Sequence, residues 1–487
     1  MPRLFPRTAN LLKPESKIIV RIIFVIHELI VLRLLVQHEM WRDEIQAWSI
    51  AKASSTPLDV IRNTRFEGRP PLWQLIIWPL AKVFSDPNVM KILTFLMGSI
   101  AIWIWLHRSP QPLLLRACIS FGFLFTGGYF VHSRDYIAMF LILMLITETF
   151  RRRGVTNSFV ALICGLSLIN LFGLIIAGAL VLSILLPHWW QIHSERNKSN
   201  QLQCALHFVL TSTTFLFSAY WIYPKSTSQF GVGNYLNWYK PLSNSVFPFL
   251  SSNESNNILF AVLAIAVLGV LTIGLFLQNR PAAIFLLAAC FVLALNASFG
   301  YAFYWWHWGS TAIVLITAPL LFHAPKESKS EIPKTLVNVC FSIIAISGLW
   351  ANFRGPGEAV YGKQPYSMSQ ETALQIKKLC VPECQVIVDW DATGSSISAY
   401  LDGKSLYYLN RQEFGTYAKF VRTNIVPTWQ QAIDVMRKFN RPILITTDLL
   451  TGPLPPEFEL VEAPWGGVWD NALIVQLGEN QIRSDSP

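Results

Sequence analysis

The chain has 487 residues, of which 52% are hydrophobic and only 14% are charged. A soluble chain would carry charge on about a quarter of its residues, so this composition predicts a polytopic α-helical membrane protein. Its apolar runs are continuous and do not alternate, which excludes a transmembrane β-barrel. The net charge of +10 lies in short basic clusters between apolar runs, as topology signals do, so nucleic-acid binding is not expected.

The first apolar segment, residues 18–37, is too long and too charged for a signal-peptide core, so we expect it to remain as a membrane anchor. The loop that follows, residues 38–88, carries acids, arginines and tryptophans where a simple connection would carry neutral residues. Charged groups at a membrane boundary are costly and usually mark function. We therefore interpret this loop as the reaction site.

Helical patterns recur inside the loop. Residues 43–53 have an apolar side, and Thr56-Pro57 is typical of a helix start. Residues 71–84 are apolar but fall short of the roughly 20 residues that a span needs. We predict that these helices lie on the membrane surface.

If residues 71–84 lie on the surface and do not cross, the sequence predicts about eleven spans. The N-terminus and the triple arginine Arg151–Arg153 are then in the cytosol, and the loop 38–88 is outside. The expected spans are residues 18–37, 89–107, 112–131, 136–150, 157–170, 171–187, 202–222, 257–278, 281–298, 309–323 and 334–351. If residues 157–187 form one long tilted helix instead of two short spans, everything after them inverts.

From residue 352 to 487 the composition becomes that of a soluble domain, which the span count places outside the cytosol. Helices are expected at residues 369–379, 395–401 and 427–439, and strands at 385–389, 442–446 and 472–476. This order predicts a small α/β domain without a glycine-rich phosphate loop. Cys380 and Cys384 have too few neighbouring ligands for a metal and form either a local disulfide or two free thiols.

Asp43 and Glu44 are the leading catalytic candidates. Adjacent carboxylates near an apolar boundary repel each other and are partly desolvated, which raises a carboxyl pKa and suits general-base work. The alternative interpretation is a helix N-terminus whose acids complement the macrodipole. A second candidate, the turn at Glu67-Gly68-Arg69-Pro70, holds an arginine beside a carboxylate, or is a simple junction before a helix.

Arg134, Asp135 and Tyr136 join two expected spans on the side of the loop 38–88. Arginine suits bidentate binding of phosphate oxygens, although it could equally be a snorkelling anchor paired with Asp135. His307 lies in a tryptophan-rich stretch that either contacts a sugar or forms an interfacial aromatic belt. Arg354, beyond the last span, is a second phosphate contact or an anchor.

The combination resembles the glycosyltransferase C superfamily. The residues that carry the resemblance are Trp41 to Glu44, Phe66 to Leu72, and Arg134 with Tyr136. They are similar to the W-x-D-E, F-E-x-x-P-P-L and arginine-before-tyrosine patterns of the branch with protein O-mannosyltransferases and lipid A aminoarabinose transferases. The likeness covers the membrane part to about residue 148. Arg69 departs from it, since family members often carry lysine there.

The resemblance implies an enzyme of the cell membrane that takes a sugar from a polyprenyl-phosphate donor on the outer face. The acceptor would be a lipid, a glycan or a protein. Asp43 would be the general base, and Glu44 would orient the acceptor or the base. Arg134 would hold the donor phosphate and Arg69 would support the charge that develops on it. No cofactor is implied with certainty; a divalent cation is an option, with too few ligands in view to argue for one.

The rival hypothesis is a transporter or flippase of lipid-linked sugars, because His27, Glu28 and Arg33 lie within the first span. Such a protein would contain paired inverted halves, and no internal symmetry of that kind is evident. A structural or assembly protein is the third alternative.

Overall fold

The computed structural model describes residues 14–194, 198–223, 239–250, 258–299, 305–321, 331–354, 360–361, 364–381, 383–421, 424–447, 450 and 452–478. The basic residues before position 14 and the aromatic residues 301–304 lie outside this part of the chain. Contacts divide the chain into two compact units. The helical unit contains residues up to 36 and most of 93–361, whereas the sheet unit combines residues 37–92 with the C-terminal part from 362 onward.

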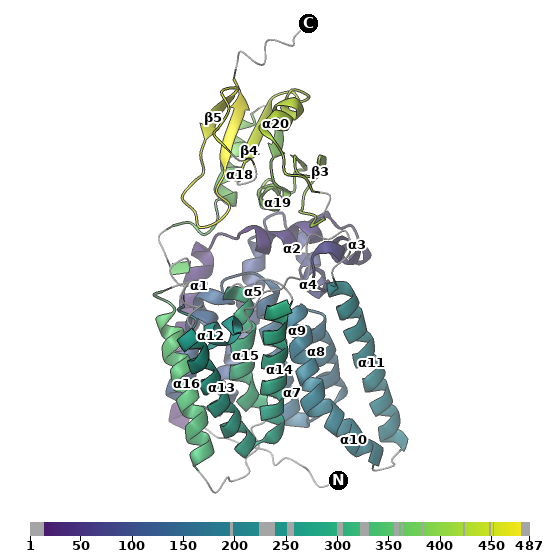
Figure 1. Cartoon of the computed structure of the whole chain (residues 1–487), viewed down its shortest axis with the longest axis vertical. Coiled ribbons are helices and arrows are strands. Elements are labelled where there is room, and N and C mark those ends of the chain that lie inside the picture. The colour runs from purple at the N-terminus through teal and green to yellow at the C-terminus, as the bar shows by residue number, and fades with distance from the viewer. Residues whose placement is uncertain are drawn as a thin grey trace. The chain divides into compact units, whose positions relative to one another are not determined.

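The helical unit is built almost entirely from helices. They are α1 (Pro14–Gln37), α5 (Val89–Arg108), α6 (Leu113–Ser120), the π-turn η2 (Leu124–Gly128), α7 (Asp135–Arg153), α8 (Asn157–Ser167), α9 (Leu171–Leu180), the π-turn η3 (Val181–Leu185), α10 (Leu186–Ser194), α11 (Lys198–Ile222), α12 (Lys240–Val246), α13 (Ile258–Gln278), α14 (Arg280–Phe299), α15 (Trp305–Leu321) and α16 (Ile332–Trp350). Helices α13 and α16 pack side by side within it (Figure 1).

Six helices in the described residues are long and apolar enough to cross a membrane. They are Val89–Arg108, Leu171–Ser194, Asn200–Ile222, Ile258–Gln278, Arg280–Ser298 and Ile332–Trp350. Large apolar side chains such as Leu206 and Val209 on α11 are more than half exposed, as expected of residues that a bilayer covers. The chain is therefore a multi-pass helical membrane protein. Helices α1 and α7 contain more charged residues than these six, and α8 is shorter.

Three predicted spans, 112–131, 157–170 and 171–187, differ in outcome. The stretch 112–131 is not one helix: α6 ends at Ser120, and the chain continues through the π-turn η2. The break lies where Gly122 approaches the backbone of Gly348 in α16, so close that an added Cβ would lie 3.4 Å from its carbonyl carbon. The predicted break within 157–187 is confirmed, because Asn170 caps a new helix by accepting the Gly173 N–H at 2.7 Å. Only the second of the two helices, which continues to Ser194, is long enough to cross a membrane.

The sheet unit combines short helices with one mixed sheet. Its helices are α2 (Arg42–Ala53), α3 (Pro57–Asn63), the 3₁₀ turn η1 (Thr64–Phe66), α4 (Leu72–Val83), α18 (Ser369–Leu379), α19 (Asp391–Tyr400) and α20 (Trp429–Met436). Its strands are β1 (Gln385–Val388), β2 (Leu406–Tyr408), β3 (Glu413–Gly415), β4 (Pro442–Thr446), β5 (Phe458–Glu462) and β6 (Leu473–Leu477).

The sheet forms the middle of three layers, with strand order β3-β2-β1-β4-β6-β5. Strand β1 runs parallel to both β2 and β4, and the outer strands are antiparallel to their neighbours. Val386 and Val388 pack against α18 and α19, while Ile387 between them packs against α20 on the other face. Because α19 and α20 cover opposite faces, the direction of winding changes at β1, and the carboxyl edge of such strands is where α/β sheets usually place functional groups.

The predicted helices and strands of the C-terminal part are confirmed, with small differences at their ends. Helices are also found in the first loop, residues 38–88, as predicted. Thr56 caps α3 as predicted, accepting the Asp59 N–H at 3.2 Å. Helix α4 has 12 residues, and at about 1.5 Å per residue it is too short to span a bilayer. The strands β2, β3 and β5 are not predicted, since two of them have three residues each, too few for an alternating pattern.

Candidate active site

Glu44 is engaged in the start of helix α2. Its carboxylate accepts the Trp41 N–H at 3.3 Å and lies 2.8 Å from His38 Nε2, and its side chain is fully buried. It therefore satisfies a backbone donor that the first turn of a helix leaves open. Of the two interpretations, the helix N-terminal acid describes what Glu44 does in the structure.

Asp43 occupies the same turn but remains partly exposed. The residue before it, Arg42, is fixed through both its backbone N–H and its guanidinium. Its N–H donates to Asp470 at 3.1 Å, and its guanidinium lies 4.5 Å from the ring centre of Trp390. Trp41 packs against Trp469, with ring centres 5.0 Å apart. The first turn of α2 is thus fixed by residues from the C-terminal part of the sheet unit.

Burial sets the electrostatics of this turn. It raises the pKa of Glu39, while backbone N–H groups and His38 act in the opposite direction. Burial also raises the pKa of Asp470 above its usual 3.8, and this effect outweighs the lowering by Arg42, Ser367 and Ser369. Desolvation is thus the first cause of both raised pKa values, that of Glu39 before α2 and that of Asp470 against Arg42. The predicted raised pKa within the Asp43–Glu44 pair stays a prediction.

Glu67 and Arg69 form the ion pair that their spacing predicts. Arg69 Nη2 donates to Glu67 Oε2 at 2.9 Å, with side chains 12% and 3% exposed. Gly68 between them has a φ of +67°, a left-handed conformation that favours glycine. The turn therefore brings the two charges together out of water, where a hydrogen-bonded ion pair is strong.

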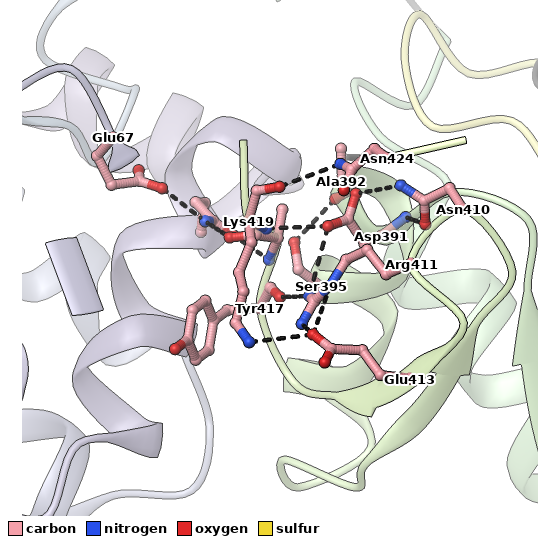
Figure 2. Close-up of polar contacts among 12 residues, drawn as sticks. Glu67, Asp391, Ala392, Ser395, Asn410, Arg411, Glu413, Tyr417, Lys419 and Asn424 are labelled. Atoms are coloured by element: carbon pink, nitrogen blue, oxygen red, sulfur yellow. Dashed lines mark hydrogen bonds and ion pairs between the residues drawn. The ribbon is translucent and has the colours of Figure 1, made fainter. Parts of the chain in front are cut away.

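Gln46 links this pair to the C-terminal part of the sheet unit. Its Nε2 donates to Glu67 Oε1 and to the Ala418 carbonyl, each at 2.8 Å, and its Oε1 accepts the Ala418 N–H at 2.9 Å. Figure 2 shows Glu67 facing the residues Asp391, Arg411 and Lys419, which come from the other side of this contact. Hydrogen bonds thereby connect Glu67 to the carboxyl edge of strand β1, through Gln46 and the residues around Ala418.

Asp391 is the centre of the C-terminal side of this network. It accepts the Lys419 N–H at 2.9 Å and the Asn410 amide at 2.9 Å, and it pairs with Arg411 at 3.4 Å. Burial raises its pKa, and these donors act against that rise. Asp391 opens helix α19 directly behind β1, so the network extends from the sheet.

Three predicted residues of the helical unit lie in one aromatic group. The Arg134 guanidinium lies 5.3 Å from the ring centre of Tyr136, which stacks on Tyr129 at 4.8 Å. His307 joins them through Phe172, which has its ring centre 6.1 Å from Tyr136 and 5.3 Å from His307. An arginine beside aromatic faces is suited to a ligand with an anion and an apolar or sugar part.

Asp135 and Arg354 have different surroundings. Asp135 is buried and accepts the Asn170 side-chain amide at 3.1 Å, so it ties the start of α7 to the start of α9. Arg354 is exposed just beyond the end of α16. The predicted role of Arg354 as a phosphate contact stays a prediction.

The sequence reasoning missed Gln46, Asp391, Arg411 and Asp470. Gln46 stands in an ordinary amphipathic pattern, and nothing in the sequence marks its partner Ala418. Asp391 had a weak signal, because an acid that follows a buried strand at the start of a helix is typical of the functional edge of an α/β sheet.

Within the described ranges, no three His, Cys, Asp or Glu side chains gather as the ligands of a metal ion would. Cys380 and Cys384 are joined as a disulfide, with Cα atoms 4.9 Å apart. A scan of the chain against protein-family models and a search of curated proteins both found no match.

Proposed function

We propose that the chain is a membrane glycosyltransferase of the glycosyltransferase C type, with about eleven spans. It moves a sugar from a polyprenyl-phosphate donor to a lipid, glycan or protein acceptor outside the cytosol. The observation that carries the proposal is the state of Asp43. This carboxylate is partly exposed, while its neighbours Arg42 and Glu44 are held by Asp470 and by the helix start. A general base needs this combination of access and fixed position.

In the proposed reaction, Asp43 takes the proton of the acceptor hydroxyl as its oxygen attacks the anomeric carbon of the sugar. The bond from that carbon to the phosphate oxygen breaks, and its electron pair leaves on the polyprenyl phosphate. Attack opposite to the leaving group inverts the anomeric carbon. Arg134 binds the donor phosphate, Arg69 supports the negative charge that grows on it, and Tyr136 and His307 offer ring faces to the donor.

The test uses Asp43→Asn in the full chain. Membranes that contain the variant are supplied with a panel of radiolabelled polyprenyl-phosphate hexoses and pentoses, together with a membrane extract from a deletion strain as acceptor. Loss of the base should lower sugar transfer at least about 100-fold, as general-base catalysis typically contributes this much or more. The amount of folded protein in the membrane should stay the same.

Asp59→Asn is the matched control, because it makes the same chemical change in the same loop, at a position of α3 that is also partly exposed. That variant should keep its sugar transfer. Full activity of Asp43→Asn would exclude the base assignment, and no transfer from any donor of the panel by the wild-type chain would exclude the proposed reaction.

A transporter of lipid-linked sugars is the second candidate, and one cluster in the helical unit favours it. His27 and Glu28 of α1 lie 3.0 Å apart, His27 contacts the Phe125 carbonyl at 2.9 Å, and Glu28 accepts a hydrogen bond from Ser99. Ionisable side chains inside a span often mark a transport route. A transporter would lose function in Glu28→Gln and keep it in Asp43→Asn, the reverse of the pattern expected for the transferase.

A further inference from the structure

The side-chain amide of Gln46 is buried, with only 4% of the residue exposed, and its partners occupy both of its ends. A backbone N–H requires an acceptor, and a carboxylate requires a donor. The Ala418 N–H therefore fixes Oε1 on its side, and Glu67 fixes Nε2 on the other, with 2.9 and 2.8 Å between the bonded atoms. The Gln46 side chain thus makes two hydrogen bonds to the backbone of Ala418 and a third to Glu67.

The stretch around Ala418 is itself held firmly. Lys419, one residue later, donates its N–H to Asp391 at 2.9 Å, and Tyr417, one residue earlier, accepts from Arg411 at 2.8 Å. Arg411 and Asp391 are 4% and 2% exposed and pair with each other. Figure 2 shows these side chains converging on the 417–419 stretch. The position of Ala418 is therefore set by the carboxyl edge of the sheet.

At the other end of the chain of contacts, the two oxygens of Glu67 have different donors. Oε1 receives Gln46, and Oε2 receives Arg69 at 2.9 Å. Because the Glu67 side chain is only 3% exposed, losing one donor would leave an oxygen short of a partner out of water. Glu67 would then shift or admit water, and Arg69 would lose the contact that orients it.

We propose that Gln46 is a positioning residue through which the C-terminal domain orients the guanidinium of Arg69. The order of contacts is the sheet edge at Asp391, then Ala418, then Gln46, then Glu67 and Arg69. The inference rests on the proposed function for the role of Arg69, and goes beyond it. The C-terminal domain becomes a structural part of the reaction site, whatever acceptor it does or does not bind.

Hydrogen exchange of the full chain in detergent micelles tests the link without any sugar. In Gln46→Leu, the Ala418 amide should exchange at least about tenfold faster, since it loses its acceptor, and the amides of residues 66–69 should also exchange faster. Gln430→Leu is the matched control, because Gln430 makes a comparable bond, 2.8 Å to Asp434, at an exposed position of α20. Faster exchange at Ala418 with unchanged exchange at 66–69 would overturn the proposal.

Sugar transfer tests the functional consequence. Gln46→Leu should lower kcat about tenfold and leave the KM for the polyprenyl-phosphate donor within about twofold, since Arg69 acts on charge that develops during the reaction. In a Glu67→Gln background, the same substitution should add little further loss, because both changes break one chain of contacts. An unchanged kcat with faster exchange at 66–69, or independent and additive losses, would overturn the positioning role.

Gln46→Glu keeps the shape of the side chain and covers the case in which the leucine variant does not fold. Its ionised carboxylate cannot donate to Glu67 or to the Ala418 carbonyl, whereas its protonated form regains one donor. Activity relative to the wild type should therefore rise as the pH falls, and a flat ratio would contradict the proposal. If the wild type transfers no sugar, the proposed function fails, while the exchange measurement still decides whether the link exists.

Discussion

Asp43 and Glu44 are neighbours in the sequence, yet their surroundings separate them. Glu44 is buried against His38 and the Trp41 N–H, and Asp43 is partly exposed. The two residues differ because of their positions in α2. Glu44 is the third helical residue and can reach back to the backbone of the cap residue, whereas Asp43 is the second and cannot.

Asp470 shows how burial controls a charge at the same helix start. It accepts the Arg42 N–H and the hydroxyls of Ser367 and Ser369, at 3.1, 2.9 and 3.2 Å. Burial nevertheless raises its pKa above the usual 3.8. The folded chain therefore binds this proton more tightly than the unfolded chain does. Between pH 3.8 and the raised pKa, the contribution of Asp470 to stability falls as the pH rises.

We predict that acidification through this window stabilises the wild-type protein relative to Asp470→Asn, which has no carboxyl to protonate. Thermal unfolding followed by tryptophan fluorescence measures the effect, since Trp41, Trp390 and Trp469 lie around Arg42 and report on this part of the sheet unit. The difference in midpoint between the two proteins should change in favour of the wild type as the pH falls. Parallel pH profiles would show that Asp470 is not responsible.

Helix α19 connects the sheet to the first loop. One of its faces covers β1 and β2, and α2 packs on it as well, where Ser49 Oγ donates to the Ser395 carbonyl at 3.3 Å. Gly394 allows the close approach to the sheet: an added Cβ would lie 2.5 Å from Tyr408 Cε1 and 3.3 Å from Val388 Cβ. The absence of a side chain at this position lets α19 lie directly on the strands.

We expect Gly394→Ala to lower the free energy of unfolding of the sheet unit by about 2 kcal/mol, because overpacking a close contact forces the ring or the helix to move. Urea unfolding with a probe in the C-terminal part measures this change. Gly269→Ala in α13 is the control, since a Cβ there meets nothing within 4 Å and alanine favours a helix. The control should lose no stability, and the same result for Gly394→Ala would contradict the packing argument.

At the scale of the whole molecule, the chain does not divide where its composition changes. Residues 37–92 follow α1 and reach into α5, yet they form one compact unit with residues after 361. Three contacts hold these two segments together: the ring contact of Trp41 with Trp469, and the hydrogen bonds of Arg42 with Asp470 and of Gln46 with Ala418. The sequence had assigned the loop to the membrane domain, with the C-terminal domain separate from residue 352.

A chain that ends at residue 361 should therefore lose the structure of its first loop. Removing the C-terminal part takes the Trp469 ring from Trp41, the Asp470 carboxylate from the Arg42 N–H and both Ala418 bonds from Gln46, which favours local opening. Limited proteolysis of membranes should cut residues 37–92 faster in the truncated chain than in the full chain. Cleavage of α11 in the helical unit should be unchanged. Equal cleavage of the first loop would show that it folds independently.

The amino-acid sequence determined the local features: the multi-pass helical class, the short helices of the first loop, the strands β1, β4 and β6, and the Glu67–Arg69 pair. These follow from apolar run length, caps, turn residues and spacing, which act over a few residues. The tertiary structure decided which distant groups meet. Three contacts join residues that are 226 to 428 positions apart in the chain: Gly122 with Gly348, Gln46 with Ala418, and Arg42 with Asp470. No local pattern marks such partners, because burial of one element against another selects them.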